Sequence, residues 1–107
     1  MKKLSKVSII IRTKNEERWI TTCLDKIFSQ SYKNFEVILA DNCSKDKTLK
    51  KAKKYPIRHI KIKKFIPGTA INDAIKISSG KIIVCLSAHC IPVDNNWLKR
   101  LIGPLKN

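Results

Sequence analysis

The pattern that decides the fold lies near the start of the chain, where an apolar run leads directly into a polar turn: Val7-Ser8-Ile9-Ile10-Ile11-Arg12-Thr13-Lys14-Asn15-Glu16-Glu17. A short continuous apolar run is typical of a strand that is buried on both faces of a sheet. Asn15 can cap a helix, and Glu16 and Glu17 would then stand in its first turn, where the helix dipole favours negative charge. Apolar residues follow in pairs spaced four apart, which predicts one face of an amphipathic helix; they are Trp19, Ile20, Cys23, Leu24, Ile27 and Phe28.

The same alternation of strand and helix continues along the whole chain. We expect further strands at residues 35–40, 57–62 and 81–86, and further helices at residues 47–55, 69–78 and around 97–102. Ser44 or Asp46 can cap the second helix, and Asp94 can cap the last. The strand at residues 57–62 carries interleaved Lys and Arg, which favours the edge of the sheet, whereas residues 81–86 are typical of a buried strand. Regular alternation predicts an α/β fold: a Rossmann-like parallel sheet with helices on both faces.

The composition indicates one small, strongly basic domain. The chain has 107 residues, with 23 Lys plus Arg against 8 Asp plus Glu and a net charge of +15. We expect a single domain over residues 1–107. The longest apolar run, residues 82–88, is too short to span a bilayer, and no apolar leader is expected at the start. A cytoplasmic protein is therefore expected, soluble or peripheral on the inner face of the membrane.

Four cysteines, Cys23, Cys43, Cys85 and Cys90, lack the two-residue spacing of zinc or redox motifs. Cys85 and Cys90, with His89 between them, can be drawn as part of a metal cluster. The simpler interpretation is that Cys23 and Cys85 are small core residues, because both lie within apolar stretches. Without a secretory leader, reduced thiols are expected.

Ligands of parallel sheets bind at the carboxyl ends of the strands, and here those ends are residues 12–16, 41–46, 64–68 and 87–90. Neither a G-x-G-x-x-G nor a G-x-x-x-x-G-K-[ST] motif is present, which excludes the commonest dinucleotide and phosphate-loop sites. Asp41 can accept hydrogen bonds from a base or a ribose hydroxyl. Alternatively, residues 41–46 form a turn in which Ser44 and Asp46 bind backbone donors.

Three segments in order resemble family 2 of the inverting glycosyltransferases, which have the GT-A fold. Residues 7–16 resemble the opening strand and Asn-Glu turn of that family. Ala40-Asp41-Asn42-Cys43-Ser44-Lys45-Asp46-Lys47-Thr48 resembles its Asp-(Asp/Asn)-x-Ser-x-Asp-x-Thr motif, which is the most specific match. Gly68-Thr69-Ala70-Ile71-Asn72-Asp73-Ala74, with the later Gly80, resembles its Gly-x-x-x-Ala-Arg-Asn segment. Together they cover nearly the whole chain.

The resemblance implies a nucleotide-sugar donor of the UDP or dTDP type lying across the carboxyl edge of the sheet. It implies transfer of the sugar, with inversion, to a glycan or lipid-linked acceptor in cell-envelope polysaccharide synthesis. Asp41 would read the edge of the base. The nucleotide-binding residues that it implies are Arg12, Thr13, Lys14, Glu16, Asp41, Ser44, Gly68, Asn72 and Ser87.

The sequence departs from the family pattern in two places. Ile71 stands where the family has the Arg of Ala-Arg-Asn. Ser87-Ala88-His89 stands where the family has the Asp-x-Asp that meets ribose and a divalent metal. Ser87 can still bind a ribose hydroxyl. His89 can ligate Mn²⁺, although imidazole is a poorer ligand for Mg²⁺ than a carboxylate; the alternative is a loop histidine with an ordinary hydrogen bond.

The general base of the family, usually an Asp, lies beyond the metal motif, and no carboxylate follows Asp94 here. The resemblance therefore implies a donor-binding half, truncated before the acceptor half, that binds nucleotide with little or no turnover. We expect a truncated sheet to expose an edge and to favour self-association.

Two rival classes stay open: a small basic nucleic-acid-binding protein and a noncatalytic α/β domain. The charge favours the first, but the sequence has no helix-turn-helix, zinc or RRM signature, and its aromatic residues are scattered. Ten of the basic residues fall within residues 45–64. They form either a solvated face or a docking surface for anionic lipid.

Overall fold

The structure is a computed structural model that describes residues 5–62 and 69–105. Its elements follow one another as β1 (Val7–Thr13), α1 (Ile20–Phe28), β2 (Phe35–Asp41), α2 (Thr48–Ala52), β3 (Arg58–Lys61), α3 (Thr69–Ile77), β4 (Ile82–Ser87) and α4 (Trp97–Ile102), with a 3₁₀ turn at Gly103–Leu105. The strands form one parallel sheet in the order β3-β2-β1-β4. The alternating α/β fold predicted from the sequence is confirmed.

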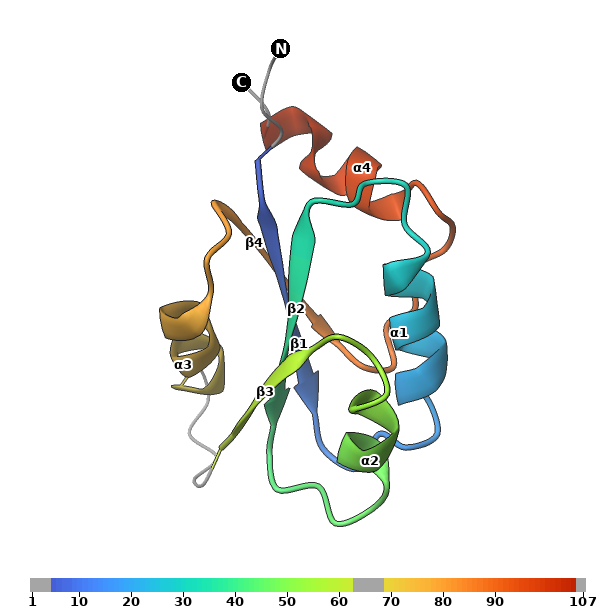
Figure 1. Cartoon of the computed structure of the whole chain (residues 1–107), viewed down its shortest axis with the longest axis vertical. Coiled ribbons are helices and arrows are strands. Elements are labelled where there is room, and N and C mark those ends of the chain that lie inside the picture. The colour runs from blue at the N-terminus through green and yellow to red at the C-terminus, as the bar shows by residue number, and fades with distance from the viewer. Residues whose placement is uncertain (1–4, 63–68, 106–107) are drawn as a thin grey trace.

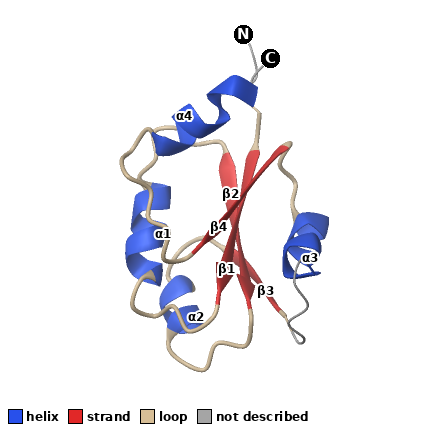
Figure 2. Ribbon diagram, turned by 180° about the vertical axis from the view of Figure 1, so that it is seen from behind, coloured by secondary structure: helices blue, strands red, loops and turns tan. Residues whose placement is uncertain are grey.

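Helices cover both faces of the sheet, but unequally (Figures 1 and 2). Helices α1, α2 and α4 lie on one face, and α3 lies alone on the other. The alternation of side chains along β1 supplies both cores: Ile9 and Ile11 pack under the three helices, whereas Ile10 packs with Ile38 and Ala74 of α3. The face under α3 is therefore the thinner of the two.

Helix α1 begins four residues later than the sequence predicts. Asn15 does not cap it; the helix begins at Ile20, and no side chain caps its first turn. Instead, Asn15 adopts a left-handed backbone with φ of 52°. The backbone N–H groups of Glu16 and Glu17 donate to Thr48 and Asp46 in the neighbouring loop, at 2.8 and 3.2 Å. The carbonyl of Glu16 accepts the N–H groups of Trp19 and Ile20 at 3.0 and 2.9 Å, so a turn, and not a helix, leads from this loop into α1.

Strand β4 does not lie in the interior of the described sheet. It forms one edge, and β3 forms the other, as predicted for β3. The expectation that Cys85 is a core residue is wrong. Cys85 lies on the same face of the sheet as α3, but α3 does not cover it and it is exposed. Cys23 is fully buried in α1, as predicted, and its burial raises the pKa of its thiol to about 12.

The amino end of the sheet is held by a polar network around Glu36 of β2. Its carboxylate accepts hydrogen bonds from the Ser8 hydroxyl at 2.6 Å, from the Ser79 backbone N–H at 2.6 Å and from Arg58 at 2.9 Å. These contacts join β1, β2, β3 and the turn between α3 and β4. Gly80, in that turn, donates its N–H to the Ser8 hydroxyl at 2.8 Å.

Helix α4 is fixed to the end of α1 by a buried glutamine. Gln30 is fully buried, and its amide oxygen accepts the backbone N–H of Leu98 at 3.0 Å. Its amide nitrogen donates to the carbonyl of Asp94 at 2.7 Å. Gln30 thus supplies the cap that α4 lacks from its own Asn96. Within the described part of the chain, every helix is too short or too polar to reach across a bilayer.

Candidate functional site

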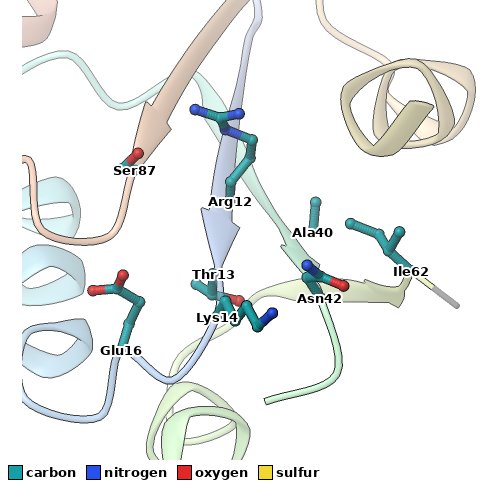
Figure 3. Close-up of a pocket in the computed structure, with 8 residues that line it drawn as sticks. All are labelled: Arg12, Thr13, Lys14, Glu16, Ala40, Asn42, Ile62 and Ser87. Atoms are coloured by element: carbon teal, nitrogen blue, oxygen red, sulfur yellow. The ribbon is translucent and has the colours of Figure 1, made fainter. Parts of the chain in front are cut away.

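A cavity of about 290 Å³ opens at the carboxyl edge of the sheet. Figure 3 shows its lining, which comes from the ends of all four strands and from the loops that follow β1 and β2. The lining residues are Arg12, Thr13, Lys14, Glu16, Ala40, Asn42, Ile62 and Ser87. The position agrees with the general rule for parallel sheets, in which the loops after the strands form the ligand site.

The strand register explains why these residues meet. Arg12 is paired in register with Ala40 of β2 on one side and with Ser87 of β4 on the other. All three side chains therefore lie in one row across the sheet, on the face that α3 only partly covers. Five of the residues that the sequence singles out line the cavity together; they are Arg12, Thr13, Lys14, Glu16 and Ser87.

The cavity lining carries two cations, Arg12 and Lys14, and one carboxylate, Glu16. Arg12 stands on a central strand of a parallel sheet, a position that is normally apolar because both faces are covered. Its side chain is exposed, and among the described residues neither Arg12 nor Lys14 forms an ion pair. An unpaired guanidinium with five donors is suited to bind a planar or tetrahedral anion. The arrangement is therefore chemically suited to an anionic ligand.

Asp41 lies behind the cavity wall and not in the lining. It is fully buried, and one carboxylate oxygen accepts the hydroxyls of Thr13 at 2.7 Å and Ser44 at 2.6 Å. The other oxygen accepts the backbone N–H of Ser44 at 2.9 Å. Both oxygens are thus engaged with the turn, and Ser44 is drawn into this network, outside the lining. In this structure Asp41 shapes the cavity from below.

Asn42, the next residue, lines the cavity, and sequence reasoning did not single it out. Side chains alternate between the two faces of a strand. Leu39 and Asp41 are buried under α1 and α2, so Asn42 lies on the opposite face, toward the cavity. Ala40 and Ile62 form apolar walls beside Asn42 and were missed for the same reason. Of the remaining predictions, Asn72 is exposed on α3 away from the lining, and Gly68 falls outside the described residues.

The loops after β1 and β2 are tied to each other by reciprocal hydrogen bonds. The Asn15 N–H donates to the Ser44 hydroxyl at 2.9 Å, and the Lys45 N–H donates to the Asn15 side-chain oxygen at 2.8 Å. Asn15 and Cys43 both have positive φ, 52° and 50°. Asn tolerates this region well, and Cys does so at some cost. The two turns therefore hold each other in shape at the mouth of the cavity.

Asp46 also connects the loop after β2 to the loop after β1. It accepts the N–H of Glu17 and, at 2.9 Å, the N–H of Thr48 at the start of α2, but the N-cap residue of that helix is Lys47, not Ser44 or Asp46 as the sequence predicts. Burial opposes ionisation of this carboxyl, but the hydrogen bonds from Thr48 and Glu17 outweigh burial and lower its pKa. A charged Asp46 thus joins α2 to the loop that carries Glu16.

His89 lies beside the cavity, opposite Glu16. Its Nδ1 is 3.4 Å from Oε1 of Glu16, and its side chain is mostly exposed. Within the described residues no three His, Cys, Asp or Glu side chains gather closely enough to hold a metal ion. An imidazole and a carboxylate side by side do match the donor set that Mn²⁺ accepts, with other ligands coming from a bound molecule.

The chain was compared with known proteins. Residues 8–107 match Glycosyl transferase family 2. Over 105 residues the chain is 38% identical to the dolichyl N-acetyl-alpha-D-glucosaminyl phosphate 3-beta-D-2,3-diacetamido-2,3-dideoxy-beta-D-glucuronosyltransferase of Methanococcus voltae, a match that covers 90% of this chain and 32% of that protein.

Two solved structures are also similar. S. aureus TarS 1–349 in complex with UDP-GlcNAc superposes with a TM-score of 0.81 and 27% identity, over 92% of this chain and 30% of that one. The mannosyltransferase PcManGT of Pyrobaculum calidifontis, in complex with GDP-Man and Mn²⁺, gives 0.83 and 25%, over 96% and 33%. The chain thus spans about a third of the length of these relatives. By its sequence match and its fold, the chain belongs to glycosyltransferase family 2.

Proposed function

We propose that the chain binds the nucleotide-sugar donor of an inverting glycosyltransferase, with a UDP or dTDP type of donor. The observation that carries the proposal is Arg12 on the central strand, which has no ion pair among the described residues and lines a cavity large enough for part of such a ligand. The family membership and the UDP-GlcNAc complex of TarS support it.

Arg12 and Lys14 are suited to hold the diphosphate. Both side chains are exposed and line the cavity, and a diphosphate supplies anionic oxygens with which both can pair. A charge-assisted hydrogen bond to phosphate is about twice as strong as one between neutral groups. The cations therefore supply affinity for the part of the donor that all nucleoside diphosphates share.

Asn42 is suited to read the base. Its amide offers one acceptor and two donors, which match the N3–H and a carbonyl of uracil or thymine. Ala40 and Ile62 supply apolar walls for the ring. Glu16 and Ser87, which lie on the other side of the lining from Asn42 (Figure 3), can bind ribose hydroxyls. Asp41, Ser44 and Thr13 then position this wall through their shared network, whereas Asn72 on α3 would need a larger ligand to take part.

His89 is the proposed protein ligand of a divalent metal, Mn²⁺ or Mg²⁺, with Glu16 beside it. The complex of PcManGT with Mn²⁺ supports a divalent metal in this family. When bound, the metal would offset the negative charge that develops on the departing diphosphate. His89 is more suited to Mn²⁺ than to Mg²⁺, because imidazole is a softer ligand than carboxylate.

In the reaction proposed for the whole enzyme, an acceptor hydroxyl gives its proton to a general base and attacks the anomeric carbon. The bond from that carbon to the diphosphate oxygen breaks with inversion, and the nucleoside diphosphate leaves. Glu16 is the one described carboxylate in the cavity lining, and it faces His89. Asp94 is held by Arg100 at 2.9 Å, beside α4. Because neither carboxylate is placed as a free general base, we propose that the isolated chain binds the donor without turnover. A glycan or lipid-linked acceptor, met at the cytoplasmic face of a membrane, fits the family.

Calorimetric titration with UDP, dTDP and GDP, with and without Mn²⁺, tests this proposal. We expect binding of UDP or dTDP, and a loss of about 10- to 100-fold in affinity for Arg12→Ala, the size of a charge-assisted hydrogen bond. Asn42→Ala should weaken binding at an unchanged melting temperature, and Asn95→Ala, in the exposed loop before α4, is the matched control. His89→Ala should remove only the part of the affinity that depends on Mn²⁺.

Asp41→Asn separates shaping of the cavity from contact with the ligand. The new amide N–H₂ would face the Thr13 or Ser44 donors, which costs about 1–3 kcal/mol of stability. A flat response across the nucleotide panel, together with tight binding of single-stranded or duplex nucleic acid, would instead favour a basic nucleic-acid-binding protein. Absence of both would favour a noncatalytic α/β domain.

A further inference from the structure

The basic residues around α2 have few acidic partners. Between residues 45 and 61 the described chain has one carboxylate, Asp46, and that group is engaged in backbone hydrogen bonds. Two of the cations there are paired, Lys51 with Glu17 and Arg58 with Glu36. The others are exposed and form no ion pair among the described residues; they are Lys45, Lys47, Lys50, Lys53, Lys54 and Lys61. We call these six side chains the basic surface.

Acidic side chains elsewhere do not neutralise it, because most are engaged where they stand. Asp41 is buried, Glu36 holds the amino end of the sheet, and Asp94 pairs with Arg100. Asp25 accepts the Tyr55 hydroxyl on the side of α1 that faces α2. Much of the net charge of +15 is therefore carried on lysines that form no ion pair among the described residues, and six of them lie in α2, beside its two ends and at the end of β3.

The basic surface begins at the rim of the cavity. The Thr48 hydroxyl, at the first residue of α2, accepts the N–H of Glu16, which lines the cavity, at 2.8 Å. Lys45 is tied through its backbone to Asn15, in the loop after β1. Figure 1 shows α2 towards the end of the sheet at which β1 and β2 finish. Whatever the basic surface binds is therefore brought beside the opening of the cavity.

Tyr55, the aromatic residue that follows α2, packs against α1 and is not available to stack on a base. The ring of Tyr55 stacks on Phe28, with centroids 5.8 Å apart and planes at 12°. Its hydroxyl bonds Asp25 of α1. Proteins that bind single-stranded nucleic acid interleave cations with exposed aromatic rings on which bases stack. Among the described residues the cations of the basic surface are not interleaved with exposed rings, so this surface fits an array of phosphates better than one of bases.

We infer that the basic surface docks on an anionic lipid bilayer, with α2 against the headgroups and the cavity beside them. Clusters of four to eight Lys or Arg are typical of such electrostatic contacts, and each lysine near the surface contributes on the order of fivefold in affinity. The inference goes beyond the donor site: it rests on charge and exposure, and it would hold whichever nucleotide the cavity takes.

Vesicle co-sedimentation tests it, with vesicles of phosphatidylcholine alone or mixed with phosphatidylglycerol. The test variant is Lys50→Glu/Lys53→Glu/Lys54→Glu. The matched control is Lys76→Glu/Lys81→Glu/Lys99→Glu, which makes the same change of net charge on α3, the start of β4 and α4. All six side chains are exposed, and circular dichroism checks that both variants stay folded.

We expect the parent chain to bind only the phosphatidylglycerol vesicles, and to lose that binding as salt rises. The test variant should bind about 100-fold more weakly, from roughly fivefold for each lysine, and the control should keep most of the binding. Equal losses in the two variants, or equal binding to both kinds of vesicle, would overturn the inference. So would tight binding to nucleic acid that is lost in the test variant while vesicle binding is unaffected. UDP titration of both variants separates failure of this surface from failure of the donor site.

Discussion

At the scale of single residues, Gly80 is fixed by the close approach of β1. A Cβ built on Gly80 would lie 2.5 Å from the Ser8 hydroxyl oxygen, 2.6 Å from the Ser8 nitrogen and 2.9 Å from the Val7 carbonyl carbon. Two of these atoms are backbone atoms of the central strand, which cannot move without disturbing the sheet. The family-like glycine after α3 therefore has a packing reason, independent of any ligand.

Gly80→Ala should lower the free energy of unfolding by about 1–3 kcal/mol, the usual cost of forcing extra volume into a packed site. The control is Gly103→Ala, because a Cβ there meets nothing within 4 Å. Urea unfolding of the two variants measures the difference. Equal midpoints for Gly80→Ala and Gly103→Ala would show that β1 and the turn before β4 can separate at no cost.

Asp41 and Asn42 show which features of the site the sequence predicts and which depend on packing. The motif placed both at the end of β2, and the register put that end beside Arg12 and Thr13. The sequence run at residues 37–40 is continuously apolar, so it hides which face is which. Only the packing of α1 and α2 over Leu39 and Asp41 decides that Asp41 is buried and that Asn42 meets the cavity.

At the scale of elements, the network around Glu36 joins three strands and one turn through a single carboxylate. Burial opposes its ionisation, but the hydrogen bonds from Ser79 and Ser8, with the nearby charge of Lys6, lower its pKa to about 2. The ordinary value is 4.5. The ionised form is therefore preferred in the folded state. Its contribution to stability is present above pH 4.5 and is lost as the pH falls towards 2.

Glu36→Gln should cost about 2–3 kcal/mol of stability at pH 7, the order of magnitude that such a pKa difference represents. The deficit relative to the parent should shrink as the pH falls from 4.5 to 2, because the parent then loses the same charge. Urea midpoints across this range measure it. Glu17→Gln, which removes a half-exposed partner of Lys51, is the control and should change little. A deficit for Glu36→Gln that is constant with pH would contradict this account.

Helix boundaries were less predictable than the existence of the helices. The start of α1 is moved by hydrogen bonds from a loop about 30 residues away, between Glu16 and Thr48. The cap of α4 comes from Gln30, 68 residues from Leu98. The residues around a helix end do not reveal partners that lie so far away in the sequence. By contrast, the edge position of β3 followed from its own charges, Arg58 and Lys61, because charge on a strand is a local signal.

At the scale of the whole molecule, the two edges of the described sheet differ in character. Strand β3 carries Arg58, His59 and Lys61, whereas β4 has no charged residue over Ile82–Ser87 and exposes Cys85. Charge on an edge strand opposes pairing with other strands, and an uncharged edge permits it. The expected self-association is therefore directed to β4 and held back by the net charge of +15.

We expect sedimentation velocity to show self-association that increases with salt, as the repulsion between like-charged copies is screened. Cys85→Lys should reduce it by placing on β4 the kind of charge that β3 already has. Thr22→Lys, on the exposed face of α1, adds the same charge elsewhere and should leave association nearly unchanged. A chain that stays monomeric at all salt concentrations, or equal effects of the two variants, would refute β4 as the contact.

The reciprocal ties between the loops after β1 and β2 have a thermodynamic consequence for any ligand of the cavity. Asn15 bonds Ser44 and Lys45, and Glu17 bonds Asp46, without help from a bound molecule. The conformational entropy of these turns is thus lost when the chain folds and not when the ligand arrives. A preorganised mouth of this kind favours fast, rigid-body docking of the donor. The amides of both loops should already be protected from hydrogen exchange in the free protein.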